Sequence, residues 1–460
     1  MAQSAVMLKK KGYRVYGSDQ KIYPPASTFL QNEGIKIFEG YRSQNLADNP
    51  NIVVIGNALS RGNPEVEEVL NRKLKYLSLP EIIKEFFIRG RKSIVVTGTH
   101  GKSTTTGIIA HIFKHSGYEP GFMLGGVLRD YNSGACVGKG DYFIVEGDEY
   151  DTAFFDKHSK FLHYLPDHVI INAIEYDHAD IFVSLDDIMT SFRHLINIIP
   201  SNGALIVNGH DENAVNLSRL SLAPVLTFGL NKEFSMSGDN FLFTKEGTSF
   251  DLYKNGNFQS RVNTKMLGYH NVKNVLGALL CAINLGIEEE AAIKALNTYI
   301  GVKRRLELIL DDKSIKVYDD FAHHPTSIKV TLEALRLAYP DRRIIAIFEP
   351  RSNTMVTNIF EKELPSSFDS ADIILISGIH RPDNVKKENR LNPEFLCNQL
   401  NKNGKSTHYM KNHDNIPELL EELVKTDDVL VFMSNGDFGG IAGKFVKNYL
   451  QNSRVNGKLS

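Results

Sequence analysis

The feature that most constrains this chain is a stretch in which an apolar strand leads through two glycines into a helix. Residues 94–96 are Ile-Val-Val, Gly98 and Gly101 follow, and Lys102 and Ser103 come next, before three threonines. Glycines let backbone N–H groups approach phosphate oxygens, and the start of a helix favours negative charge. A lysine at this place reaches the outer phosphates, and a serine can hold Mg²⁺. The stretch therefore predicts a nucleotide-binding loop, with an ordinary strand–turn–helix as the alternative.

The loop departs from the general phosphate-binding pattern at one position. That pattern has a glycine five residues before Gly101, and this chain has Val96 there. The loop is the shorter form Thr-Gly-Thr-x-Gly-Lys-Ser. We expect nucleotide phosphates to contact Gly98, Thr99, His100, Gly101, Lys102, Ser103 and Thr104.

Composition and charge exclude several classes of protein. The chain has 460 residues, which suggests about two to four domains. Its hydrophobic content of 42% is typical of a globular protein, and a net charge of −1 provides no general attraction to nucleic acid or membranes. No stretch approaches the roughly 20 apolar residues of a membrane span, and no signal peptide is evident. The three cysteines, which are far apart and in no metal-binding spacing, fit a reducing compartment. We expect a cytoplasmic protein without nucleic-acid or membrane partners.

Strand and helix patterns alternate along the chain and predict an α/β fold of doubly wound parallel sheets. Polar linkers divide it into three predicted domains, residues 1–92, 93–301 and 302–460. We expect an amino-terminal Rossmann-like domain, a central phosphate-loop ATPase domain with a parallel sheet, and a carboxy-terminal Rossmann-like domain. The first strand and glycine-rich loop that such an amino-terminal domain carries do not occur after Met1. Asp19 follows a predicted strand, where acidic residues contact a ribose hydroxyl in dinucleotide-type folds.

The expected elements are defined by apolar periodicity and turn residues. Helices are predicted over residues 2–10, 64–72, 81–88, 104–115, 185–198, 271–285, 288–299 and 325–338. Strands are predicted over residues 14–16, 51–55, 142–145, 168–173, 204–207, 315–318, 343–348, 372–376 and 429–432. Residues 234–263 alternate in hydrophobicity around two glycine-containing turns and predict a small antiparallel patch.

Two acidic turns follow predicted strands of the central segment. The first, residues 146–149, is Glu-Gly-Asp-Glu, and the second, residues 175–180, contains His178 among carboxylates. Ligands bind at the carboxyl ends of parallel strands, and Mg²⁺ prefers oxygen ligands and bridges to phosphate. We expect the first turn to bind metal, the alternative being a solvated acidic turn. His178 is expected either to hold a second Mg²⁺ or to orient a reacting group, although a lone histidine is usually structural.

Four further polar clusters lie at the starts of helices or the ends of strands. The asparagines of residues 270–274 can pair with an adenine edge or cap a helix. Residues 304–305 and 319–325 carry arginines, aspartates and two histidines, without the ligand spacing of a zinc site. Residues 349–354 and 434–440 are strand-end loops suited to substrate, and an arginine in the first would bind a carboxylate bidentately.

Taken together, these motifs resemble those of the muramyl ligase family of the peptidoglycan pathway. The shared order comprises the Thr-Gly-Thr-His-Gly-Lys loop, the acidic turn, Asp-His-x-Asp, His-Asn-x-x-Asn, Arg-Arg-x-Glu and the Asp-Asp-Phe-x-His-His-Pro motif, over residues 97–325. His100 and the His-His-Pro motif resemble the motifs of the branch of this family that acts on the muramyl lactyl carboxylate. Residues 148–161, 349–355 and 434–440 resemble the branch member that joins L-alanyl-γ-D-glutamyl-meso-diaminopimelate to UDP-N-acetylmuramate. The alternative is the member that joins L-alanine.

The resemblance implies a mechanism and roles for individual residues. The γ-phosphoryl of ATP passes to the lactyl carboxylate, and the amine of the peptide attacks the resulting acyl phosphate. The implied catalytic residues are Lys102, Glu149, His178 and Arg305. The implied Mg²⁺ ligands are Ser103 and Glu149, with His178 for a second ion. Adenine, phosphate and ribose contacts are implied for Asn271, Asn274, Arg305 and Asp320. Substrate contacts are implied for Asp19, His324, Arg351, Ser352 and Asn353, with Arg351 on a peptide carboxylate.

Two departures and two rival functions accompany this resemblance. Several relatives carry a carbamylated lysine about fifteen residues after the metal-binding histidine, and this chain has Arg193 there. The first strand and the glycine-rich loop, which do not occur after Met1, are the elements that would bind UDP in such a domain. The rivals are a regulatory module that hydrolyses ATP without ligation and a binding protein without activity. We expect a monomer or a weak homodimer.

Overall fold

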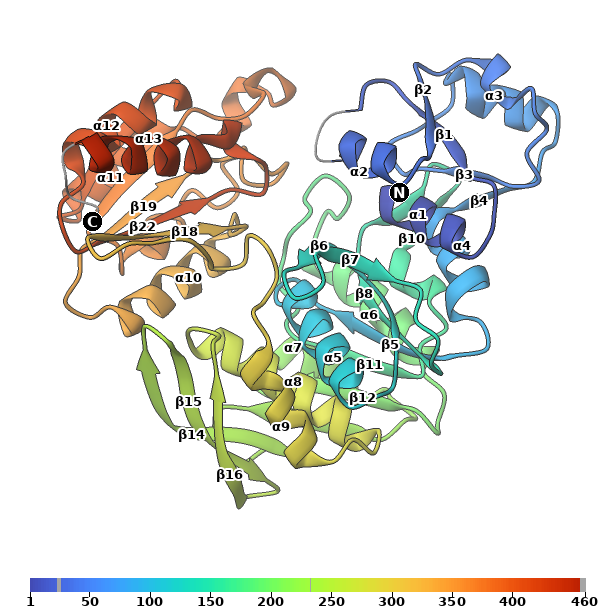
Figure 1. Ribbon diagram of the computed structural model, residues 1–460, viewed down its shortest axis with the longest axis horizontal. Coiled ribbons are helices and arrows are strands. Elements are labelled where there is room, and N and C mark those ends of the chain that lie inside the picture. The colour runs from blue at the N-terminus through green and yellow to red at the C-terminus, as the bar shows by residue number, and fades with distance from the viewer. Residues whose placement is uncertain (23–25, 232, 456–460) are drawn as a thin grey trace.

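The chain folds into three α/β units that follow one another along the sequence (Figure 1). The computed structural model describes residues 1–22, 26–231 and 233–455. The first unit (blue) and the last unit (orange to red) both lie above the central unit in that view. The predicted domain boundaries after residues 92 and 301 stay predictions, and the first strand of the central unit already begins at Lys92. No helix among the described residues is long and apolar enough to cross a membrane.

The first unit contains two separate pairs of parallel strands. Its elements are α1 (Ala2–Lys10), β1 (Tyr16–Asp19), α2 (Ala26–Asn32), β2 (Lys36–Glu39), β3 (Val53–Ile55), α3 (Pro64–Asn71), β4 (Tyr76–Ser78) and α4 (Leu79–Ile83). β1 pairs with β2, and β3 pairs with β4. The helix predicted over residues 81–88 begins earlier, because Ser78 and Glu81 form a capping box, and its second half is a π-helical turn.

The central unit is built on a ten-stranded sheet of order β16-β15-β14-β13-β12-β11-β5-β8-β6-β7. Its strands are β5 (Lys92–Thr97), β6 (Gly121–Leu128), β7 (Ser133–Cys136), β8 (Tyr142–Gly147), β11 (His168–Ile171), β12 (Ala204–Asn208), β13 (Val225–Gly229), β14 (Met236–Thr244), β15 (Gly247–Lys254) and β16 (Asn257–Thr264), and β9 (Asp151–Ala153) and β10 (Asp156–Ser159) form a separate hairpin. Its helices are α5 (Lys102–His115), α6 (Leu185–Asn197), α7 (Glu212–Ser218), α8 (Tyr269–Asn284) and α9 (Glu289–Thr298). The antiparallel patch expected over residues 234–263 is β14 to β16, and it continues the parallel sheet through β13.

Helices bury both faces of the central sheet, as expected for a parallel arrangement. Ile94 and Val96 of β5 pack in a core with residues of α5, α8 and α9, whereas Val95 packs in a second core with residues of α6 and α7. Alternate residues of one strand therefore enter different cores. The sheet order places β5 between β8 and β11, with Thr97 opposite both Gly147 and Ile171. The loops that leave these three strands consequently start at the same edge.

The last unit has a six-stranded sheet of order β17-β18-β22-β19-β20-β21, parallel except for β17. Its elements are β17 (Glu307–Asp311), β18 (Ile315–Asp320), α10 (Pro325–Ala338), β19 (Ile344–Phe348), β20 (Ile373–Ser377), α11 (Pro393–Lys402), β21 (Ser406–Met410), α12 (Ile416–Leu423), β22 (Asp428–Met433) and α13 (Ile441–Val455). α10 and α11 pack on one face, and α12 and α13 pack on the other. β17, β21 and the last three helices were not among the predicted elements.

We predict opposite effects for two glycine-to-alanine changes in helices. A Cβ atom at Gly107 in α5 would lie 2.5 Å from both Leu128 Cδ2 and Tyr299 Oη, inside a packed core, whereas a Cβ at Gly443 in α13 would meet nothing within 4 Å. Gly107→Ala should therefore lower the free energy of unfolding by about 1–3 kcal/mol through overpacking. Gly443→Ala should raise it by about 0.5 kcal/mol, because alanine restricts the unfolded chain. Scanning calorimetry of both variants tests this, and stabilisation by Gly107→Ala would contradict it.

Candidate active site

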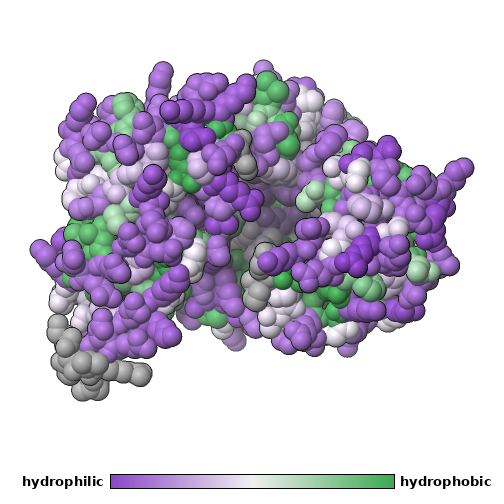
Figure 2. Space-filling view, turned by 90° about the horizontal axis from the view of Figure 1, so that it is seen from above, coloured by the Kyte–Doolittle hydropathy of each residue, from purple (hydrophilic) through white to green (hydrophobic). Residues whose placement is uncertain are grey.

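A cavity of about 750 Å³ lies between the central and last units and is lined by residues of both. Seen from above, the molecule is hollowed between the last unit and the first (Figure 2). Thirteen of the predicted site residues line the cavity: Thr99, His100, Gly101, Lys102, Thr104, His178, Asn271, Asn274, Arg305, Asp320, Arg351, Ser352 and Asn353. The cavity therefore collects predicted residues that are more than 250 positions apart in the sequence.

The phosphate loop needs both of its glycines. Gly98 and Gly101 have φ angles of 123° and 77°, which favour glycine. A Cβ atom at Gly98 would lie 2.7 Å from the backbone oxygen of Ala173, and one at Gly101 would lie 2.4 Å from Asn274 Oδ1. Because Gly101 precedes the first turn, α5 begins at Lys102, two residues earlier than predicted. The start of a helix thus borders the cavity, which favours an anion there.

Lys102 is held by a buried carboxylate. Its Nζ donates to both carboxylate oxygens of Glu149, at 2.9 and 2.8 Å, and to the backbone oxygen of Gly98 at 2.8 Å. Burial by itself would lower the pKa of Lys102, but the negative charges of Glu149 and Asp148 outweigh burial and raise it. The ammonium group therefore stays charged beside the phosphate loop.

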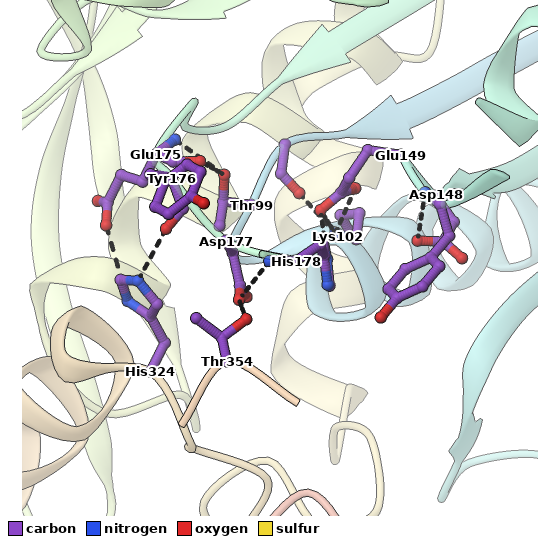
Figure 3. Close-up of polar contacts among 12 residues, drawn as sticks. Thr99, Lys102, Asp148, Glu149, Glu175, Tyr176, Asp177, His178, His324 and Thr354 are labelled. Carbon is purple, nitrogen blue, oxygen red and sulfur yellow. Dashed lines mark hydrogen bonds and ion pairs between the residues drawn. The ribbon is translucent and has the colours of Figure 1, made fainter. Parts of the chain in front are cut away.

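Glu149 also joins a group of residues that could hold a metal ion. His178 Nε2 lies 3.0 Å from Glu149 Oε1, and ligand atoms of Asp148, Glu149 and His178 all lie within 4.8 Å of one another (Figure 3). Lys160 Nζ donates to Asp148 at 2.5 Å. Two carboxylates and an imidazole next to a phosphate loop fit a Mg²⁺ ion that also binds phosphate oxygens.

Ser103 is predicted to ligate a Mg²⁺ ion together with Glu149, and this role stays a prediction. Here Ser103 Oγ donates to Glu146 Oε2 at 2.8 Å, and the backbone N–H of Gly125 donates to the same oxygen. Successive residues of a helix point about 100° apart, so Ser103 does not face the carboxylate that Lys102 contacts. The structure groups Asp148, which the prediction omitted, with Glu149 and His178.

The two predicted adenine contacts make hydrogen bonds within the protein. Asn274 donates to Asn271 Oδ1 at 3.1 Å and accepts from the hydroxyl of Thr105 at 3.2 Å, and Asn271 donates to the backbone oxygen of Leu267 at 2.9 Å. These bonds fix the start of α8 against α5. A contact of either side chain with adenine stays a prediction, and Lys273, between them in sequence, also lines the cavity.

Arg305 and Asp320 both lie where the last unit begins. The guanidinium group of Arg305 lies 4.8 Å from the ring centroid of Phe321. Asp320 is buried and accepts hydrogen bonds from the backbone N–H groups of Leu306 and Ala322, at 2.5 and 2.7 Å. Burial raises the pKa of Asp320. Asp320 thus fixes the linker that carries Arg305, and its predicted ribose contact is untested.

His324 is not exposed to the cavity as a substrate contact would be. It is 5% exposed and accepts a hydrogen bond from the backbone of Thr326 at the start of α10. Its ring lies 4.9 Å from that of His100, and both rings face Glu175. These three residues also form a group of metal-ligating type, but a hydroxyl hydrogen bond of 2.6 Å from Thr326 occupies Glu175. The cluster is a contact between domains.

The remaining predicted substrate residues have different surroundings. Arg351 lies 3.6 Å from a carboxylate oxygen of Glu349 and 3.2 Å from one of Asp437, and Asn353 donates to Asp180 at 2.9 Å. Asp19 lies at the end of β1 in the first unit, exposed and outside the residues that line the cavity.

Sequence reasoning missed several residues of the cavity. Glu175 and Asp177 belong to the acidic turn of His178, and their own roles were not considered. His380 and Arg381 follow β20, where polar residues at a strand end were a usable signal, and Thr354 ends the predicted arginine loop. All five line the cavity or its wall between domains.

Comparisons with known proteins give one consistent result. Family models described as "Mur ligase family, catalytic domain", "Mur ligase middle domain" and "Mur ligase, glutamate ligase domain" match residues 1–91, 96–282 and 304–436. The UDP-N-acetylmuramate–L-alanyl-gamma-D-glutamyl-meso-2,6-diaminoheptandioate ligase of Escherichia coli is 38% identical, over 97% of this chain and 95% of that protein. A UDP-N-acetylmuramate–L-alanine ligase of Clostridium tetani is 32% identical, over 97% and 95%. The crystal structure of a murein peptide ligase from Psychrobacter arcticus superposes with a TM-score of 0.71 at 34% identity, over 97% of this chain and 96% of that one.

We predict that the folded protein loses stability as the pH falls from 6.5 toward 4. Burial lowers the pKa of His270 to about 3 and those of His323 and His324 to about 4, from an ordinary value of 6.5. Between these pKa values each of the three histidines is protonated in the unfolded chain but neutral in the folded protein. The free energy of unfolding therefore falls by up to about 1.4 kcal/mol per pH unit for each histidine as the pH is lowered.

Urea unfolding at several pH values tests this, with His323→Asn as the variant. Asparagine keeps a donor for the backbone oxygen that His323 contacts but does not titrate. In a plot of the free energy of unfolding against pH, the slope of the variant should be smaller than that of the wild type by the equivalent of about one proton. Equal slopes in the two proteins would contradict the prediction.

Proposed function

The chain belongs to the Mur ligase family, and we propose that it uses ATP to join L-alanyl-γ-D-glutamyl-meso-diaminopimelate to the lactyl carboxylate of UDP-N-acetylmuramate, in peptidoglycan recycling. The observation that carries this proposal is that one cavity is lined both by the phosphate loop, with Lys102, and by the arginine loop, with Arg351. An ATP-dependent ligase needs the activated carboxylate and the incoming amine in one place. The 38% identity to the E. coli ligase supports the substrate assignment.

The chemistry would proceed in two steps. A lactyl carboxylate oxygen attacks the γ-phosphorus of ATP, giving an acyl phosphate and ADP. The peptide amine then attacks the acyl carbon, loses its proton and expels phosphate, which leaves an amide. Both steps need positioning and charge neutralisation more than a protein nucleophile. A cavity between two units also limits the access of water, which would hydrolyse the acyl phosphate.

Individual side chains fit these requirements. Lys102 would stabilise the phosphoryl group in transfer, and Arg305 would contact phosphate from the linker. Asp148, Glu149 and His178 would hold Mg²⁺, which supplies charge neutralisation at the phosphates. The proposed cofactors are thus ATP and Mg²⁺, and a cytoplasmic location suits a reaction that consumes ATP.

The charges at the far end of the cavity favour the peptide over L-alanine as the amine substrate. L-Alanine offers one carboxylate, whereas the tripeptide offers three. Arg351, His380 and Arg381 all line the cavity on the side of the last unit, and Arg381 has no ion pair among the described residues. Two guanidinium groups match a substrate with several carboxylates. The L-alanine ligase is the second candidate, since the relative from C. tetani is 32% identical.

The first unit would bind the UDP group, with Asp19 at the ribose. This assignment rests on the family model over residues 1–91 and on the position of Asp19 at the end of a parallel strand.

Phosphate release from ATP tests the proposed function directly. The assay contains Mg²⁺ and UDP-N-acetylmuramate, with either the tripeptide or L-alanine, and mass spectrometry identifies the product. Release that depends on the tripeptide, with the matching adduct, is the expected result. Release that depends only on L-alanine would move the chain to the second candidate, and release indifferent to both would indicate an ATPase without ligation.

We predict that Lys102→Gln lowers kcat by about 100-fold or more, since loss of one group that stabilises developing charge typically has an effect of that size. Lys157→Gln is the matched control, because Lys157 also pairs with a carboxylate, Asp151, but is exposed and outside the cavity. Its kcat should change little. Equal kcat values for the two variants would contradict the assignment of Lys102.

We predict that Arg351→Ala raises KM for the tripeptide by about 10- to 100-fold, because hydrogen bonds to charged groups contribute about 1.5–3 kcal/mol. Arg351→Lys should recover part of this, since lysine keeps the charge but not the planar fork. An unchanged KM in the alanine variant would exclude Arg351 from peptide binding.

A further inference from the structure

Thr354 contacts the loop that carries His178 on both sides of that histidine. It is 3% exposed and belongs to the last unit, whereas the loop belongs to the central unit. The hydroxyl of Thr354 donates to Asp177 Oδ1 at 3.1 Å and accepts from the backbone N–H of Ala179 at 3.2 Å. Figure 3 shows Thr354 below the loop, next to Asp177 and His178. One hydroxyl group thus binds the residues before and after His178.

His178 has a backbone conformation that its neighbours must hold in place. Its φ angle is 57°, in the left-handed region, which residues other than glycine adopt uncommonly. Its backbone N–H donates to Asp177 Oδ1 at 2.7 Å, the same oxygen that accepts from Thr354. The turn is therefore closed by two hydrogen bonds that converge on Asp177 and by a third at Ala179.

The side chain that this turn presents belongs to the metal-ligating group. His178 Nε2 lies 3.0 Å from Glu149, which in turn holds Lys102. A change of the backbone at His178 moves the imidazole away from Glu149. We propose that Thr354 is a positioning residue for His178, so that docking of the last unit on the central unit completes the divalent-cation site. The inference rests on the proposed function only in taking Asp148, Glu149 and His178 as metal ligands.

Among the described residues, the other hydrogen bonds between the last unit and this loop reach residues other than Asp177 and Ala179, and one of them joins His324 Nε2 to the backbone oxygen of Tyr176 at 3.3 Å. Asn353 donates to Asp180, which also accepts from Tyr150, and Thr326 donates to Glu175. These bonds hold the two ends of the loop. Asn353, next to Thr354 in sequence and also at the interface, is for this reason the matched control.

The experiment compares three variants in the full chain: Thr354→Val, which keeps the shape and removes the hydroxyl, Thr354→Ser, which keeps the hydroxyl, and Asn353→Ala. Mn²⁺ is the probe. Its dissociation constant is measured by electron paramagnetic resonance in the presence of a non-hydrolysable ATP analogue. Binding of the analogue in EDTA is measured separately, because it reports on the phosphate loop without a metal.

Thr354→Val should weaken Mn²⁺ binding by about 10-fold or more, the usual effect of losing a residue that orients a metal ligand. Thr354→Ser should restore binding to within about threefold, and Asn353→Ala should stay in the same range. Binding of the analogue in EDTA should be unchanged in all three. In turnover, the valine variant should need more Mg²⁺ and recover kcat when Mg²⁺ is raised.

Wild-type Mn²⁺ affinity in a folded valine variant would overturn the inference, as would equal losses in the valine and serine variants. Should the valine variant fail to fold, Thr354→Ala removes the same hydroxyl without adding bulk and is judged by the same criterion. These outcomes do not depend on the peptide substrate. A wild-type protein that binds Mn²⁺ but ligates neither substrate would defeat the proposed function and leave this inference standing.

Discussion

The parallel pairing of β5 between β8 and β11 is the constraint on which the site depends. In a parallel sheet all strands end at the same edge, and Thr97 lies opposite both Gly147 and Ile171. The phosphate loop, the acidic turn and the loop of His178 therefore start side by side, although they are up to about eighty residues apart in sequence. The buried apolar residues of the three strands fix the register, because a slip would move them out of their two cores.

Gathering several charges at one edge has an electrostatic cost that the site meets by pairing them. Glu149 is 2% exposed, and an isolated carboxylate at that depth is strongly disfavoured. Lys102 and His178 compensate it, and Lys160 compensates Asp148. Breaking such a pair is costly because one charge stays buried without its partner. The same pairing sets the direction of each side chain, so charge balance and site geometry have a common origin.

Features that depend on residues near one another in the sequence could be predicted from it. Contacts between residues that are far apart in the sequence could not. The phosphate loop, the α/β alternation and the antiparallel patch follow from local patterns, and the structure contains all three. The hydrogen bond of Ser103 to Glu146 was not predicted, because the direction of a side chain on the first turn of α5 depends on where β8 ends. His324 was predicted to contact substrate, yet it caps the start of α10 and lies between the two units. Nothing in the sequence indicated the hydrogen bonds of Thr354, since its partners Asp177 and Ala179 lie about 175 positions away. A threonine in a strand-end loop is ordinary until the two units are seen together.

The loop of residues 175–180 links the two halves of the proposed reaction. Its first residue contacts the phosphate loop through Thr99 and His100, and its last contacts Asn353, two residues after Arg351. Between them lies His178, in a conformation that the last unit helps to hold. In the proposed reaction, phosphoryl transfer would occur near the first contact and amine attack near the last, so one short segment would connect both steps. A substrate that draws the last unit against this loop would therefore also act on the proposed metal site, because the hydrogen bonds of Thr354 that join the two units lie on either side of His178. The acyl phosphate would thus form where water is already restricted and where the amine has its own binding groups.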